Sequence, residues 1–118
     1  MDTRPHRKLD VWKKSMDFVK HVYQVTETFP KSEIYGLNSQ MRRAAVSIPS
    51  NLAEGAARKG KKEFNQYLNI AQGSVSEIDT QIELSFILNF IDKNLYNDLM
   101  DELNTISKML FGLSRSLK

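Results

Sequence analysis

Apolar residues recur along most of this chain at the three- and four-residue spacing of one face of an α-helix. The pattern is clearest in residues 61–88, where the steps alternate mostly between four and three residues, as in helices that pack in bundles. No alternating strand pattern bounded by turn residues is present. The sequence therefore predicts an all-α protein. The apolar positions of this segment are Phe64, Leu68, Ala71, Val75, Ile78, Ile82 and Phe86.

Three further segments carry the same periodicity. We expect helices at about residues 10–28, 37–59, 61–88 and 95–116. Phe29-Pro30 should end the first, because a residue before proline avoids the helical region. Pro49 should kink the second helix, with a break into two shorter helices as the alternative. The core positions predicted for the other helices are Trp12, Met16, Val19, Tyr23 and Thr26 in the first, Leu37, Met41, Ala44, Ile48, Leu52 and Ala56 in the second, and Leu95, Leu99, Leu103, Ile106, Leu110 and Leu113 in the fourth.

Four long helices with short connections predict an antiparallel up-down four-helix bundle. At 118 residues the chain is expected to form a single domain, residues 1–118. Cysteine is absent, so disulfides and thiolate metal sites are excluded. Residues 1–8 lack the apolar core of a signal peptide, and the longest apolar run is too short to span a bilayer. We therefore expect a cytoplasmic protein with no membrane partner.

No constellation of residues predicts catalysis. Residues 55–62 come close to a phosphate-binding P-loop, but Lys62 stands where Ser or Thr must hold magnesium, and a helix precedes the segment where a strand is needed. His6 lies in a terminal segment and His21 on an outer helix face, and they fit no metal-binding or catalytic set. We expect no enzymatic activity, no catalytic or metal-binding residues and no cofactor.

The charge of the chain is polarised. Residues 42–62 carry six basic side chains and one acidic one, whereas residues 63–118 carry four basic and eight acidic ones. A concentrated positive field attracts polyanions, and Arg and Lys bind phosphate groups. Glu54 lies four residues before Arg58 and should pair part of this charge. From the residues alone, nucleic-acid contact and a solvated or subunit-paired surface stay open alternatives. The candidate phosphate contacts are Arg42, Arg43, Arg58, Lys59, Lys61 and Lys62.

Several apolar residues lie off the predicted core stripes. They are either scattered surface hydrophobes or a second apolar face that packs against another subunit, and both readings stay open. Together with the charge polarity, the second reading predicts a homo-oligomer. Gly55 and Gly73 lie inside helices, where glycine is costly, and so indicate close approach of a neighbouring helix. The off-stripe residues are Ile70, Leu84, Leu88, Met100 and Phe111.

Two segments of the second and third helices, GLNSQMRRAAVSIPSNLAEG at residues 36–55 and RKGKKEF at residues 58–64, resemble the four-helix proteins encoded in intervening sequences of bacterial 23S ribosomal RNA genes. Residues 9–12 and 108–113 are also similar to that family. Gly60 departs from it, since the family often has a serine cap there. The resemblance implies a four-helix bundle that assembles into a homopentamer. It also implies kinship with the accessory protein of diversity-generating retroelements, for which binding of nucleic acid and of a reverse transcriptase is proposed.

These observations predict a non-enzymatic, oligomeric protein that binds nucleic acid, and RNA in particular, through its phosphates. The alternative is an oligomeric scaffold whose partner is a protein such as a reverse transcriptase. Salt-dependent binding to generic RNA would separate the two functions.

Overall fold

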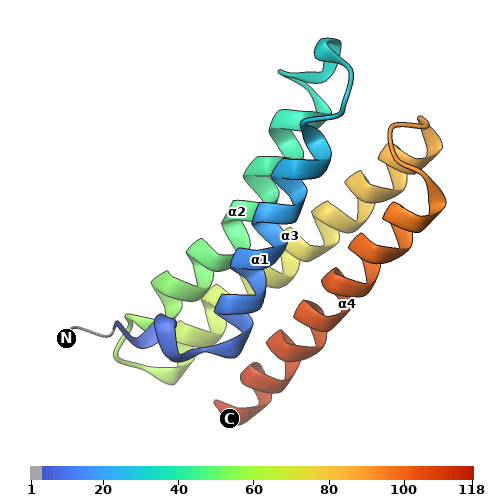
Figure 1. Cartoon of the computed structure of the whole chain (residues 1–118). Coiled ribbons are helices and arrows are strands. Elements are labelled where there is room, and N and C mark those ends of the chain that lie inside the picture. The colour runs from blue at the N-terminus through green and yellow to red at the C-terminus, as the bar shows by residue number, and fades with distance from the viewer. Residues whose placement is uncertain (1–3) are drawn as a thin grey trace.

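The computed structural model of the protein describes residues 4–118, most of which lie in four long α-helices. Consecutive helices run in opposite directions (Figure 1). The described residues contain no β-strand, and the predicted all-α four-helix bundle is confirmed. Met1, Asp2 and Thr3, which the predicted domain includes, lie outside the described residues. The elements in chain order are the 3-10 helix η1 (Pro5–Lys8), α1 (Asp10–Thr26), the 3-10 helix η2 (Lys31–Glu33), α2 (Leu37–Ala56), α3 (Lys61–Ile87) and α4 (Lys93–Ser116).

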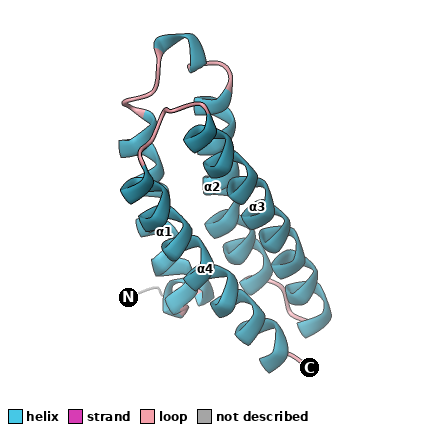
Figure 2. Cartoon of the chain, turned by 90° about the vertical axis from the view of Figure 1, so that its right-hand side faces the viewer, coloured by secondary structure: helices cyan, strands magenta, loops and turns pink. Residues whose placement is uncertain are grey.

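Each long helix packs against two neighbours, and contacts between α1 and α4 close the bundle. The α2–α3 contact is the most extensive and the α1–α4 contact the least. The molecule measures 43 × 27 × 21 Å. The η1 segment, the α2–α3 turn and the last turn of α4 lie at one end of the bundle, whereas the α1–α2 and α3–α4 connections lie at the other (Figure 1 and Figure 2).

The predicted core stripes of α2, α3 and α4 are confirmed. Their central members are at most 8% exposed, and the members near the helix ends are half-buried. This packing follows from apolar positions that repeat in phase with the helix and so bury one continuous stripe. The fully or nearly buried members are Met41, Ala44, Ile48 and Leu52 in α2, Leu68, Ala71, Val75, Ile78 and Ile82 in α3, and Leu99, Leu103, Ile106 and Leu110 in α4.

The stripe predicted for α1 is wrong in part. The core face of α1 consists of Val11, Ser15, Phe18, Val22 and Val25, with Thr26 also buried as predicted. Ser15 can lie in the core because its hydroxyl donates to the carbonyl oxygen of Val11 at 2.7 Å. The other predicted residues form a second apolar face directed toward α2. On that face Trp12 and Val19 are half-buried, and Met16 and Tyr23 are 45% and 42% exposed.

His21 also lies elsewhere than expected. It is half-buried between α1 and α4, where its Nδ1 contacts the carboxylate of Glu102. The expectation that it lies on an outer face is therefore wrong. This polar contact joins the two helices that share the least extensive packing.

The helix ends differ from the predicted ends by up to three residues. α1 ends at Thr26 rather than near Thr28, and α2 ends at Ala56 rather than near Lys59. α4 begins at Lys93, two residues before the predicted start, because the Asp92 side chain accepts a hydrogen bond from the Leu95 amide at 2.9 Å and caps the helix.

α2 continues as one α-helix across the buried Pro49, so the alternative of two separate helices is wrong. The kink predicted at Pro49 stays a prediction. No helix within residues 4–118 combines the length and apolarity that crossing a lipid bilayer requires.

Candidate nucleic-acid interface

The six candidate phosphate contacts fall into two groups at opposite ends of α2. Arg42 and Arg43 lie near its start, beside the α1–α2 connection, and the other four lie in and around the α2–α3 turn (Figure 1). At 1.5 Å per residue the helix separates the groups by about 20 Å. The structure therefore does not bring the six side chains together.

The side chain of Arg42 is engaged in contacts with α1 and Glu27. Its side chain is 26% exposed and forms an ion pair with Glu27 at 3.0 Å. Its guanidinium also donates to the carbonyl oxygen of Tyr23 at 3.2 Å and lies 4.4 Å from the Tyr23 ring centre. A guanidinium with its fork directed at a protein carbonyl and a carboxylate has little left to offer a phosphate.

Arg43, the next residue, is exposed and makes no hydrogen bond or ion pair with any residue of the described chain. It lines a shallow hollow with Tyr23, Ile34 and Val46. Its charge is thus available, but it lies far from the other available charges.

Arg58 is held in a fixed position at the end of α2. The predicted pair with Glu54 is confirmed, with the guanidinium 3.2 Å from the carboxylate. The same nitrogen donates to the hydroxyl of Tyr67 at 2.6 Å, and the guanidinium lies 5.0 Å from the Tyr67 ring centre. The side chains of Arg58 and Glu54 are 39% and 61% exposed, and exposed pairs of this kind are weak, so an incoming phosphate could replace Glu54.

Lys59, Lys61 and Lys62 are accessible to solvent. All three are exposed, and none forms an ion pair or side-chain hydrogen bond within residues 4–118.

The position of the α2–α3 turn, which contains these lysines, is set by the close packing of α2 on α3. A Cβ on the buried Gly55 would lie only 2.8 Å from Tyr67 Cβ, so the small residue lets the helices approach just before the turn.

Basic residues of both terminal segments join this turn. η1 packs against α2, and Ser114 of α4 hydrogen-bonds the side chain of Asn65 of α3. We call residues 4–10, 54–63 and 115–118 the basic end. These segments hold nine Arg and Lys and three Asp and Glu. Residues 27–36 and 88–95, at the opposite end, hold two basic and three acidic side chains.

The contribution of the termini was visible in the sequence and was missed. An up-down bundle of four helices returns its last helix to the end where the first begins, which is also the end of the second connection. The predicted topology therefore already implied that the terminal charges meet the α2–α3 turn. The residues that this adds to the candidate interface are Arg4, Arg7, Lys8, Arg115 and Lys118.

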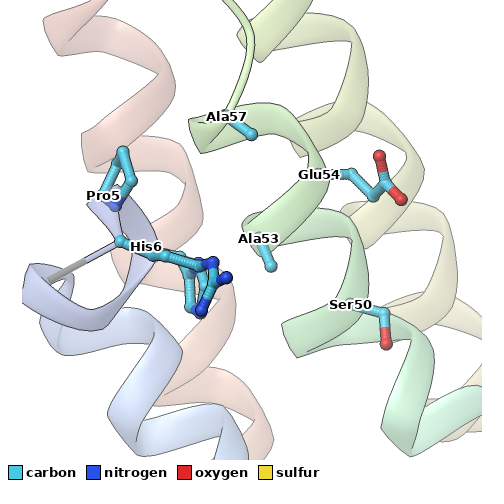
Figure 3. A pocket seen from close by; sticks show the side chains of 7 residues that line it. Pro5, His6, Ser50, Ala53, Glu54 and Ala57 are labelled. Carbon is cyan, nitrogen blue, oxygen red and sulfur yellow. The ribbon is translucent and has the colours of Figure 1, made fainter. Parts of the chain in front are cut away.

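A groove of about 640 Å³ lies beside the basic end, between η1 and α2. Figure 3 shows Pro5 and His6 on one side of it and Ala53 and Ala57 on the other. Ser50 also lines the groove, but no hydrogen bond between described residues joins it to His6, so the two do not form a nucleophile–base pair. The groove continues into an apolar hollow of about 330 Å³ between α1 and α2.

The fold and the candidate interface define an all-α bundle with an excess of basic side chains at one end. Residues 7–112 match the family model of the 23S rRNA-intervening sequence protein, and the chain belongs to this family. The predicted family resemblance is confirmed. No catalytic family is indicated by this match.

The fold is similar to the crystal structure of a protein of unknown function from the S23 ribosomal protein family of Bacteroides thetaiotaomicron. The two share a TM-score of 0.82 and 22% identity over 88% of this chain and 97% of that chain. At this identity the likeness shows the fold alone. No curated protein matches the chain.

Proposed function

We propose that the protein binds RNA without catalysing a reaction, and that the basic end supplies the contacts. The observation that supports this most is the meeting of three segments, far apart in the sequence, that together hold nine basic and three acidic side chains. The family is named for the intervening sequence of 23S rRNA, and we therefore propose RNA rather than DNA as the ligand.

Phosphate is the group that these side chains suit. Lysines on a turn are flexible point charges that neutralise phosphates without reading base sequence. Lys59, Lys61 and Lys62 have no competing carboxylate partner among the described residues. Binding through them should be insensitive to sequence and strongly weakened by salt, because each neutralised phosphate releases counterions.

The proposal includes a homo-oligomer, with a pentamer favoured by the family resemblance. Large apolar side chains stay exposed on both sides of the protomer. Met16 and Val46 are 45% and 38% exposed on α1 and α2, and Ile70 and Phe111 are 52% and 61% exposed on α3 and α4. Two different apolar faces suit a heterologous interface, which forms a ring where the rotation from one subunit to the next closes. A ring would repeat the basic end and strengthen RNA binding by avidity. We place this assembly in the cytoplasm.

A scaffold for a protein partner, such as a reverse transcriptase, is the second candidate. It is favoured by Ile87 and Leu88, which are 61% and 51% exposed beside the α3–α4 turn, at the end away from the basic residues. On this account the exposed apolar side chains dock another protein, and the basic end pairs with an acidic surface.

The two functions are separated by replacing Lys59, Lys61 and Lys62 with alanine in one variant and measuring fluorescence anisotropy of a labelled generic RNA. The matched control replaces Lys20, Lys31 and Arg43, which are also exposed but lie outside the basic end. We expect about tenfold or greater weakening in the first variant and little change in the control. Wild-type affinity in the first variant would refute the proposal. Loss of the oligomer instead would favour the scaffold.

A further inference from the structure

We infer, on the basis of the proposed function, that the basic end binds the backbone of double-stranded RNA in preference to single-stranded RNA. Proteins that bind single strands combine a basic groove with aromatic rings on which bases stack. Double-stranded RNA is instead recognised mostly by shape and by contacts to phosphates and 2′-hydroxyls. The distinction therefore depends on whether the aromatic rings near the basic end are free.

Trp12, the aromatic residue nearest to η1 in the chain, is half-buried and already in contact with two side chains of η1. The guanidinium of Arg7 lies 5.5 Å from the centre of its ring. The imidazole of His6 contacts the same ring edge-on, with the ring centres 4.9 Å apart. The ring also lines the apolar hollow between α1 and α2, which no Arg or Lys lines. A base could therefore reach Trp12 only by leaving the basic residues and entering that hollow, or by displacing Arg7 and His6 from the ring.

Tyr67, on the first turns of α3, is covered in the same way. The Arg58 guanidinium lies 5.0 Å from its ring centre and also donates to its hydroxyl at 2.6 Å. Arg58 is further held by Glu54. The aromatic surface beside the turn is thus used to fix an arginine in place, so that a cation and not a ring faces the ligand.

Phe111 is exposed on α4, but it lines a separate hollow together with Asp79 and Thr80 of α3. The carboxylate of Asp79 repels phosphate there, so an RNA strand would not place a base on the Phe111 ring. At the basic end, by contrast, the exposed cations with no side-chain partner in the described chain include Lys8, Lys59, Lys61, Lys62, Arg115 and Lys118.

These charges come from three separate segments across one end of a bundle whose two shorter dimensions are 27 and 21 Å. A rigid RNA double helix presents phosphates at fixed positions over such a width. A single RNA strand must become ordered to do so and therefore loses conformational entropy. Dispersed point charges, with the Trp12 and Tyr67 rings already in contact with arginines, therefore favour the duplex.

The test compares a duplex RNA of about 20 base pairs with an unstructured single strand of the same length, at equal phosphate concentration and fixed salt. We expect the full-length protein to bind the duplex about tenfold more tightly. Equal or tighter binding of the single strand overturns this inference and leaves the proposed function standing. Binding to neither RNA overturns both.

Two variants sharpen the comparison. Arg7→Ala with Lys8→Ala should weaken duplex binding several-fold, because it removes the charges that η1 contributes to the basic end. Tyr67→Leu should weaken duplex and single-strand binding by the same small factor, because it only releases Arg58, whereas loss of a stacking platform would weaken single-strand binding alone by about tenfold. Tyr67→Phe, which keeps the ring and removes the hydroxyl, is the matched control, and circular dichroism checks that each variant is folded. Loss of single-strand affinity alone in Tyr67→Leu, with retention in Tyr67→Phe, would contradict the inference.

Discussion

Arg42 of α2 holds the last turn of α1 through Thr26, since its Nε donates a hydrogen bond to the Thr26 hydroxyl at 2.8 Å. That hydroxyl in turn donates to the carbonyl oxygen of Val22 at 2.8 Å. The last carbonyl groups of a helix have no partner within the helix, and a guanidinium from a neighbouring helix can satisfy them. The Tyr23 carbonyl already accepts a hydrogen bond from the Glu27 amide at 3.1 Å, and Arg42 is an additional donor to it at 3.2 Å. The C-terminal end of α1 is thereby fastened to α2.

We predict that Arg42→Ala lowers the free energy of unfolding by about 1–3 kcal/mol, because the buried Thr26 hydroxyl loses its donor and the ion pair with Glu27 is lost. The matched control is Arg43→Ala, which removes an exposed side chain with no partner in the described structure and should change stability by less than about 0.5 kcal/mol. Urea unfolding followed by circular dichroism measures both. Equal stability of the two variants would show that the Arg42 contacts contribute nothing.

Two glycines inside helices should respond to alanine with opposite signs. A Cβ on Gly55 would lie 2.8 Å from Tyr67 Cβ and 2.9 Å from Phe64 Cδ1, so Gly55→Ala forces α2 and α3 apart and should cost about 1–3 kcal/mol. A Cβ on Gly73 meets nothing within 4 Å. Gly73→Ala should therefore stabilise the protein by about 0.5–1 kcal/mol through helix propensity. Thermal melts of the two variants that shift in the same direction would contradict this account.

The oligomer is tested by light scattering after gel filtration. We expect a mass near five subunits of 13.6 kDa each. Phe111→Glu should reduce this mass while leaving the helix content unchanged, because the exposed ring lies outside the core. The control Asn69→Glu adds the same charge at an exposed polar position of α3. A wild-type protein that is monomeric at micromolar concentration would return the exposed apolar residues to ordinary surface positions.

Tyr96 should titrate above its ordinary range. Its hydroxyl donates a hydrogen bond to Glu83 at 2.8 Å, and this bond raises the pKa of Tyr96 above the usual 10.0. The neutral phenol is therefore favoured in the folded state, so the stabilisation is complete below pH 10.0 and is lost as pH rises through the higher pKa of the fold. Glu83→Gln should lower the pKa of Tyr96. Phenolate absorbance, with Tyr96→Phe subtracted, measures it, and an unchanged pKa would exclude the bond as the cause.

Periodicity predicted the cores of α2, α3 and α4 because each carries one dominant apolar stripe. α1 carries two, and the pattern alone did not show which of them faces the centre. The stripe with Trp12 and Met16 contains the larger side chains, whereas the true core face includes Ser15, a polar residue whose hydroxyl is satisfied within its own helix. Local bonding of this kind leaves no trace in a hydropathy pattern.

The basic residues of the candidate interface could be predicted from the sequence, but which of them lie together in the fold could not. Arg42 and Arg43 are neighbours in the sequence with the same chemistry. They differ in their contacts because consecutive residues of a helix point about 100° apart, and only Arg42 reaches the end of α1. The pair of Arg58 with Glu54 followed from their spacing, whereas the contact with Tyr67 required the packing of α2 on α3.

The salt dependence of RNA binding tests the central claim most directly. The logarithm of the association constant, plotted against the logarithm of salt concentration, should fall steeply for the wild-type protein, by about 0.7–0.9 per neutralised phosphate. Replacing Lys59, Lys61 and Lys62 together with alanine should make the slope shallower by about 2–3, while the variant stays folded and oligomeric. A variant with the wild-type slope and affinity would contradict the claim that the basic end binds RNA through its phosphates.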